Sequence, residues 1–257
     1  MAVVKRIALI TGGGNGLGRA IAHALARQDV SIVLADLKED DAWKVLDEIG
    51  QADTGLALGG DISNPETSES WVNASVKAFG RLDILVNCAA TYLVDRFMEI
   101  SPERWDKVFA VNTKGAFFCL QAAARAMIPN GFGRIVQVST PASRLGFPDF
   151  ASYGASKAAM DSVVRSAALT LAPHGITVNQ IVPGRMTGGM IAGLEQELSK
   201  LSGKSEAELE EGRTKALPMK RRVTPEEVAE AVLWLTSDAA AYVTCERFNF
   251  TGGMELT

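Results

Sequence analysis

The chain has 257 residues, of which 47% are hydrophobic and 22% are charged, and its formal net charge is −4. This length and composition suit one globular domain over residues 1–257 with a sizeable core. The mild negative charge argues against nucleic acid as a partner, since nucleic-acid binding needs a basic face or stripe.

Cysteines and histidines are too few and too scattered to build a metal site. The three cysteines form no disulfide framework and no zinc-spaced CxxC pair, and there are only two histidines. The N-terminus lacks the apolar run of a signal peptide, and no stretch reaches the ~18 apolar residues of a membrane span. We therefore expect a cytoplasmic protein with reduced thiols, no metal and no membrane contact.

Short apolar runs alternate with longer stretches of helical periodicity. The predicted strands are Ile7–Thr11, Ser31–Asp36, Thr54–Leu58, Ile84–Asn87, Arg134–Ser139, Thr177–Val182 and Phe248–Phe250. The predicted helices are Gly16–Arg27, Lys38–Ile49, Pro65–Phe79, Pro102–Met127 and Ser152–Ala172. Strands that alternate with helices favour right-handed crossovers and a parallel sheet. We expect an α/β fold with a single Rossmann-type, doubly wound parallel sheet of about seven strands flanked by helices.

The alternation stops after Pro183-Gly184. Residues 188–222 contain no obvious strand but include a charged helical piece from Gly193 to Glu211. Two interpretations stay open: a solvated amphipathic helix, or a helical lid over a substrate. Thr224, Pro225 and two glutamates then predict the start of a capped helix.

A glycine-rich segment joins the first predicted strand to the first predicted helix. Glycines at this junction allow a tight turn and let backbone N–H groups approach a diphosphate at the helix N-terminus. The segment alone is weak evidence, but its place between strand and helix strengthens it. The residues placed to bind the dinucleotide are Gly12, Asn15, Gly16, Leu17 and Gly18.

The second predicted strand ends at Asp36-Leu37. A carboxylate at this position accepts hydrogen bonds from the ribose hydroxyls of an adenosine and repels a 2′-phosphate. No arginine or lysine stands at position 37. The sequence therefore predicts NAD rather than NADP as the cofactor.

Tyr153 and Lys157 lie four residues apart at the start of a predicted helix. Residues at this spacing share a helix face, so the phenol and the ammonium can project to the same place. A nearby cation favours phenolate, and we expect the pKa of Tyr153 to fall toward neutrality. The pair is then a candidate for general acid–base chemistry.

TGxxxGxG near the N-terminus, an acidic end to the second strand and YxxxK further along together resemble the short-chain dehydrogenase/reductase family in its compact form. The resemblance extends over nearly the whole chain. It implies an NAD-dependent oxidoreductase domain that transfers a hydride between nicotinamide and a secondary alcohol or ketone. Tyr153 would be the general acid/base, and Lys157 would tune it and bind the nicotinamide ribose.

The resemblance assigns further residues by position. Asn112 would hold a catalytic water near the lysine. Other implied cofactor contacts are Leu37, Asp61 and Ile62 near the adenosine, Asn87 and Ala89 in an NNAG-like segment, and Pro183, Gly184 and Thr187 near the nicotinamide. Thr187 stands one residue earlier than the family threonine, and Cys88 replaces an asparagine of the NNAG segment.

The family serine about thirteen residues before the tyrosine is replaced. At that spacing the sequence has Thr140, whereas Ser139 has the usual residue type one position early. Successive strand residues point to opposite faces, so we expect only one hydroxyl to serve, and we favour Thr140.

The substrate is the least determined feature. We favour a polyol, a sugar alcohol or a similar small alcohol. A carbonyl reductase, for example of 3-oxoacyl thioesters, and an NAD-sensing protein without turnover remain as alternatives. Candidate pocket residues, by position alone, are Tyr92, Pro141, Ser143, Arg144, Phe147, Phe150, Arg185, Met186 and Met190. The family resemblance also implies a homotetramer with helices 102–127 and 152–172 at one interface.

Overall fold

The computed structural model describes residues 5–188 and 191–255. Within these residues, seven strands form one sheet in the order β3-β2-β1-β4-β5-β6-β7, and every neighbouring pair is parallel. The strands are β1 Ile7–Thr11, β2 Ser31–Asp36, β3 Leu56–Gly59, β4 Ile84–Asn87, β5 Gly133–Val138, β6 Ile176–Pro183 and β7 Arg247–Phe250. The strand order changes direction between β1 and β4, where doubly wound sheets bind their ligands.

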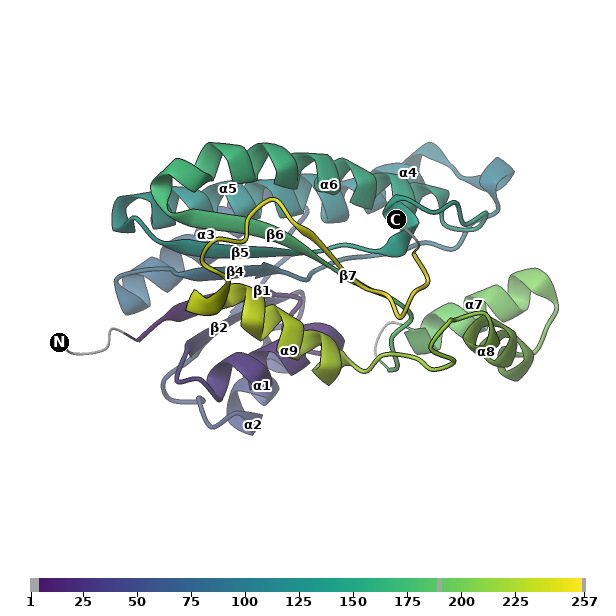
Figure 1. The fold of residues 1–257 in the computed structure, drawn as a ribbon, viewed down its shortest axis with the longest axis horizontal. Coiled ribbons are helices and arrows are strands. Elements are labelled where there is room, and N and C mark those ends of the chain that lie inside the picture. The colour runs from purple at the N-terminus through teal and green to yellow at the C-terminus, as the bar shows by residue number, and fades with distance from the viewer. Residues whose placement is uncertain (1–4, 189–190, 256–257) are drawn as a thin grey trace.

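Helices cover both faces of this sheet (Figure 1). One face carries α1 Gly16–Ala26, α2 Glu39–Glu48 and α9 Pro225–Thr236. The other carries α3 Pro65–Phe79, α4 Pro102–Phe109, α5 Ala116–Met127 and α6 Ala151–Leu171. The doubly wound fold expected from the sequence is confirmed.

The central strands are largely apolar because both of their faces are covered. Every residue of β1 and β4 is buried, as expected for strands between two helical layers. Their side chains enter two separate apolar cores, one beneath α1, α2 and α9 and one beneath α3, α5 and α6.

The helix expected over Pro102–Met127 is not continuous. A π-helical turn, Ala110–Gly115, separates α4 from α5. At Gly115 an added Cβ would lie 2.3 Å from the Ile62 carbonyl oxygen, so this turn presses closely on the segment after β3. The other boundaries agree with the predicted ones to within one residue, except that β3 begins two residues late.

Two further helices, α7 Ile191–Ser202 and α8 Glu206–Lys215, project beyond the carboxyl ends of the strands (Figure 1). The sequence predicted one helical piece here, but Gly203 has φ +72° and separates two helices. A capping box of Ser205 and Glu208 then starts α8. We call residues 191–222 the α7–α8 arm.

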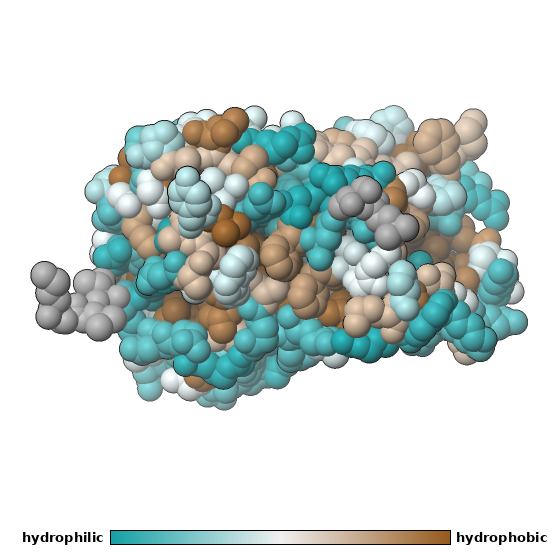
Figure 2. Space-filling model, viewed as in Figure 1, coloured by the Kyte–Doolittle hydropathy of each residue, from teal (hydrophilic) through white to brown (hydrophobic). Residues whose placement is uncertain are grey.

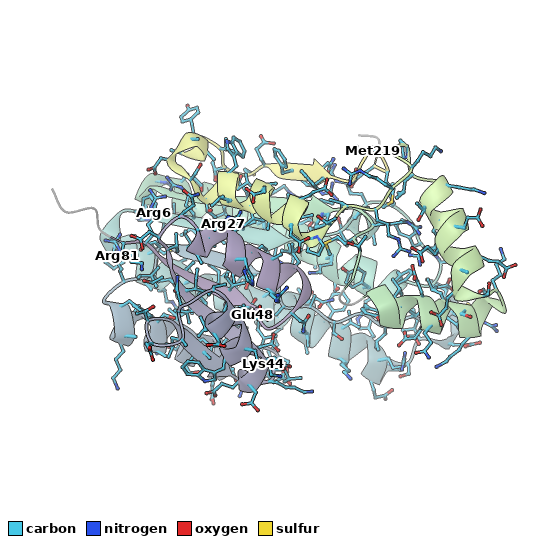
Figure 3. All side chains as sticks on the ribbon, turned by 90° about the horizontal axis from the view of Figure 1, so that it is seen from below. Arg6, Arg27, Lys44, Glu48, Arg81 and Met219 are labelled. Atoms are coloured by element: carbon cyan, nitrogen blue, oxygen red, sulfur yellow. The ribbon has the colours of Figure 1, made fainter. Side chains whose placement is uncertain are left out.

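The arm returns to the sheet along the C-terminal segment. Met219, labelled in Figure 3, lies 3.4 Å from where a Cβ on Gly252 would stand. The chain then enters α9 through Thr224 and Glu227, which form the predicted cap. Within the described ranges, no helix is long and apolar enough to cross a membrane.

Candidate active site

A cavity of about 610 Å³ opens at the carboxyl edge of the sheet, beneath the α7–α8 arm. All but two of the predicted site residues line it. They are Gly12, Asn15, Gly16, Leu17, Gly18, Asp36, Leu37, Asp61, Ile62, Ala89, Ser139, Thr140, Tyr153, Lys157, Pro183, Gly184 and Thr187. The other two, Asn87 and Asn112, are fully buried behind its wall.

At its glycine positions, the turn between β1 and α1 has no room for side chains. Gly12 has φ +66°, and a Cβ there would lie 2.9 Å from the Ala89 Cα atom. At Gly18 a Cβ would lie 2.1 Å from the Gly12 carbonyl oxygen. The turn therefore presents bare backbone to the cavity at the N-terminus of α1, an arrangement suited to phosphate groups.

Asp36 ends β2 at the same edge of the cavity. Its Oδ2 atom accepts a hydrogen bond of 2.9 Å from the Gly14 N–H, which fixes the carboxylate beside the turn. Leu37 follows and is 70% exposed. An acidic acceptor beside the expected diphosphate position is the arrangement that selects an unphosphorylated ribose.

The segment after β4 is hydrogen-bonded to the end of β1. The backbone N–H groups of Cys88 and Ala89 both donate to the Thr11 hydroxyl, at 3.2 and 3.1 Å. The Asn87 side chain points inward and donates to the Ala116 carbonyl at 2.9 Å. Burial raises the pKa of the Cys88 thiol to about 11, so this thiol stays protonated and is a poor nucleophile.

Tyr153 stands in the first turn of α6 and packs against the loop after β5. At Gly154 a Cβ would lie 2.6 Å from the Ala142 carbonyl oxygen, so only glycine lets the helix approach this closely. The approach brings the Tyr153 phenol within hydrogen-bonding reach of the Thr140 side chain. Burial raises the pKa of Tyr153 to about 12, although the bond to Thr140 acts in the opposite direction.

Lys157 lies in the same wall and is 1% exposed. Its Nζ atom donates to the Val138 carbonyl at 2.9 Å, and burial lowers its pKa to about 8. The sequence predicted that the pKa of Tyr153 would fall toward neutrality. This prediction is wrong, because the pKa is raised. Desolvation of the phenol dominates, and the Lys157 ammonium is bonded to backbone.

Ser139 and Thr140 have different partners. The Ser139 hydroxyl donates to the buried Asp161 carboxylate at 2.6 Å. Asp161 also accepts from Ser143 at 2.6 Å and from Gln180 at 2.9 Å. The proton of Ser139 is thus committed to a structural network, whereas the Thr140 hydroxyl bonds Tyr153.

The side-chain amide of Asn112 joins the π-helical turn to the segment after β4 and to α6. Its oxygen accepts from the Thr91 N–H at 2.8 Å, and its nitrogen donates to the Thr91 carbonyl at 2.7 Å and to the Ser156 hydroxyl at 3.0 Å. A π turn frees carbonyl groups from ordinary helical pairing.

Candidate pocket residues separate into two groups. Those that line the cavity are Tyr92, Pro141, Phe147, Phe150, Arg185 and Met186. Ser143 instead bonds Asp161, and Arg144 lies 3.7 Å from Glu255. Met190 lies outside the described residues.

Three further residues that line the cavity were not predicted from the sequence: Glu195, Arg213 and Arg222. Glu195 stands in the charged helical piece from Gly193 to Glu211 that one interpretation treated as solvated, and Arg213 follows two residues after its end. In a strongly charged segment, the sequence does not distinguish the charged residues that face a cavity from those that face solvent. Within residues 5–188 and 191–255, no cluster of His, Cys, Asp and Glu suits a metal ion.

A family model described as enoyl-(acyl carrier protein) reductase matches residues 12–255. A sorbitol dehydrogenase of Cereibacter sphaeroides is 34% identical, with 96% of each chain covered. An NAD-dependent glycerol dehydrogenase of Listeria innocua is also 34% identical, over 99% of this chain and 95% of its own. A 3-oxoacyl-[acyl-carrier-protein] reductase of Buchnera aphidicola is 32% identical over both complete chains.

Solved structures match over nearly the whole chain. An actinorhodin polyketide ketoreductase with NADPH superposes with a TM-score of 0.93 and 31% identity, covering 99% of each chain. An NAD⁺-bound xylitol dehydrogenase gives a TM-score of 0.89 and 28% identity, covering 96% of this chain and 98% of its own. The two neighbours carry different cofactors, so likeness alone does not choose between NAD and NADP.

Proposed function

The chain belongs to the short-chain dehydrogenase/reductase family and is an oxidoreductase, and from this premise we propose that it is an NAD-dependent dehydrogenase of a polyol or sugar alcohol. The observation that carries the proposal is the placement of Tyr153, Thr140 and Asp36 on one cavity. The first two handle an alcohol proton, and the third selects the cofactor.

The residues present suit a nicotinamide dinucleotide. The side-chain-free turn at Gly12 and Gly18 leaves space that a Cβ would fill, and Asp36 offers acceptors for ribose hydroxyls. Asp61 and Ile62 would flank the adenine, and Pro183, Gly184 and Thr187 would flank the nicotinamide. When bound, the oxidised nicotinamide accepts the hydride that leaves the alcohol carbon.

Tyr153 would take the hydroxyl proton of the alcohol, and Thr140 would hydrogen-bond the same oxygen. With a pKa of about 12, Tyr153 is almost entirely protonated at neutral pH, so little of the phenolate base is present. Positive charge beside the phenol, from Lys157 and from an oxidised nicotinamide, would favour phenolate. Lys157 would hold the ribose, and backbone of the π-helical turn at Asn112 would hold the relaying water.

Two observations favour NAD and an alcohol of small size. Asp36 is fixed by the Gly14 N–H where a 2′-phosphate would be repelled. Relatives named as sorbitol and glycerol dehydrogenases span this chain almost completely. The alternative is reduction of 3-oxoacyl thioesters with NADPH, which the 3-oxoacyl reductase relative supports. Asp36 argues against it, because its carboxylate would repel the 2′-phosphate of NADPH.

The test is absorbance at 340 nm with the purified protein, NAD or NADP, and a panel of polyols and secondary alcohols at mildly alkaline pH. We expect NADH formation with at least one polyol and little NADPH formation. Turnover of 3-oxoacyl thioesters with NADPH, without polyol oxidation, would replace the proposal with its alternative.

We also propose a cytoplasmic homotetramer. Figure 2 shows hydrophobic residues gathered along the middle of the face that carries β7 and α9, where Trp234 is 40% exposed. On α6, Leu169 is 74% exposed. A contiguous exposed apolar surface marks a site of contact between proteins. Light scattering after gel filtration should give four times the chain mass, and a monomer mass would refute the assembly.

A further inference from the structure

Three arginines from separate segments line the cavity that also holds Tyr153. Arg185 follows β6, Arg213 belongs to α8, and Arg222 lies in the segment that returns from α8 to α9. Their cations share this part of the cavity with one buried carboxylate, that of Glu195 on α7. Local positive charge therefore exceeds negative charge, although the chain as a whole is acidic.

The buried carboxylate of Glu195 already has an ion-pair partner. Glu195 pairs with Arg222, and each side chain is only 10% exposed. Glu210 is a more distant partner, 3.7 Å from Arg222 Nε and 56% exposed. Among the described residues, neither Arg185 nor Arg213 forms an ion pair with either glutamate, so neither cation has a directly paired carboxylate.

Hydrogen-bond donors of all three guanidinium groups lack acceptors. Among the described residues, the buried atoms Arg185 Nη1, Arg213 Nη1 and Arg222 Nε have no hydrogen-bond partner. A buried donor without an acceptor costs about 1–3 kcal/mol, and more when the group is charged. Three such donors at one end of a cavity indicate a ligand that accepts hydrogen bonds and carries negative charge.

Repulsion among the three guanidinium groups also favours an anionic ligand. Burial, followed by the charges of Arg213 and Arg222, lowers the pKa of Arg185 to about 10. Burial also lowers the pKa of Arg213, which Arg222 lowers further, while Glu195 opposes the change. An anion between the guanidinium groups would relieve this repulsion and the desolvation together.

We propose that Arg185, Arg213 and Arg222 bind an oxyanion of the substrate, a carboxylate or a phosphate, so that the enzyme acts on an acidic polyol rather than a neutral one. This inference rests on the proposed dehydrogenase function. The diphosphate of the dinucleotide is a less suitable occupant, because the glycine-rich turn and the N-terminus of α1 already provide its amide donors. Arg213 and Glu195 come instead from the α7–α8 arm.

The first arm of the test measures binding without turnover. Calorimetry follows succinate and inorganic phosphate, with neutral 1,4-butanediol for comparison, on the NADH-bound enzyme. The variants are Arg213→Gln, Arg213→Lys, which keeps the charge but loses the planar fork, and Lys215→Gln. Lys215 is a matched control on the same helix, 74% exposed and paired with Glu211.

We expect the wild type and Lys215→Gln to bind succinate or phosphate but not the diol. Arg213→Gln should weaken that binding at least ~tenfold, and Arg213→Lys should lie between. The stronger of the two anions identifies carboxylate or phosphate as the substrate group. Arg213→Gln should melt no lower than the wild type, because it removes a repelled cation.

The second arm compares kcat/KM for neutral and acidic partners: glycerol with glycerate and glycerol 3-phosphate, and sorbitol with gluconate. The acidic member should be preferred in the wild type, and Arg213→Gln should lose that preference through KM. Turnover of neutral polyols without anion binding would overturn the inference and leave the dehydrogenase intact. A parallel loss of NADH affinity in Arg213→Gln would assign the cluster to the cofactor and overturn it as well.

Discussion

Neighbouring hydroxyls at positions 139 and 140 differ in what they bond, and this difference can be measured. Thr140→Ala removes the partner of the Tyr153 phenol and should lower kcat about 10²-fold, as loss of one hydrogen-bond donor at a reacting oxygen does. Ser139→Ala removes a bond to Asp161, which keeps Ser143 and Gln180 as donors.

Ser139→Ala should therefore cost about 1 kcal/mol in the free energy of unfolding and leave kcat nearly unchanged. Denaturant titration and initial rates on both variants separate the two roles. The reverse pattern, with kcat lost in Ser139→Ala alone, would show that the serine is the catalytic hydroxyl.

Lys157 makes stability depend on pH. Its pKa is about 8 in the folded protein and near 10.5 when exposed, so between these values the unfolded chain binds more protons. The free energy of unfolding should then rise with pH from about 8 toward 10.5. Lys157→Met should lack this rise. Denaturant titrations of both proteins at pH 7.5 and 9.5 provide the check, and equal pH dependence would contradict the lowered pKa.

At the scale of elements, α6 can position Tyr153 only because it closely approaches the loop after β5. Gly154→Ala would place a Cβ 2.6 Å from the Ala142 carbonyl oxygen, and α6 would have to shift. A displacement of about 1 Å in a catalytic group can cost ~10²-fold in rate. We expect kcat to fall at least tenfold while NADH binding changes less.

Gly146 offers a matched control in the same loop region, since an added Cβ there meets no atom within 4 Å. Gly146→Ala should retain wild-type kcat. Equal losses in the two variants would mean that the loop tolerates neither alanine, and the close approach at Gly154 would not explain the effect.

The sequence predicts elements well where the signal is local. Buried strands read as runs of branched apolar residues, and Thr224 with Glu227 predicts its cap from residues three apart. The π-helical turn was missed because one added residue hardly changes the apolar periodicity of 102–127. The break at Gly203 was missed because a glycine inside a charged helical pattern does not by itself reveal its φ angle.

At the scale of the whole molecule, the site assembles from segments that are distant in the chain. The order of motifs predicts the cavity residues because strand ends of a parallel sheet meet at one edge. The arginine cluster could not be predicted in this way. Glu195, Arg213 and Arg222 meet only after the α7–α8 arm folds over that edge, and nothing in their spacing marks the contact.

Burial also reversed one expectation about the site. The YxxxK spacing predicts a lowered tyrosine pKa, yet the enclosed cavity raises that pKa to about 12. Spacing along a helix reports which residues share a face, but desolvation depends on what covers them. The pKa of Tyr153 therefore depends on what encloses the phenol, which the spacing of the motif does not show.

The central claim, that Tyr153 exchanges a proton with the substrate during hydride transfer, is tested most directly by Tyr153→Phe. Stopped-flow absorbance at 340 nm measures NADH formation with the best polyol, and NADH fluorescence measures cofactor affinity. We predict that the rate falls by about 10² to 10⁴-fold while NADH affinity changes little. Undiminished hydride transfer in Tyr153→Phe would contradict the account and remove the tyrosine from the reaction.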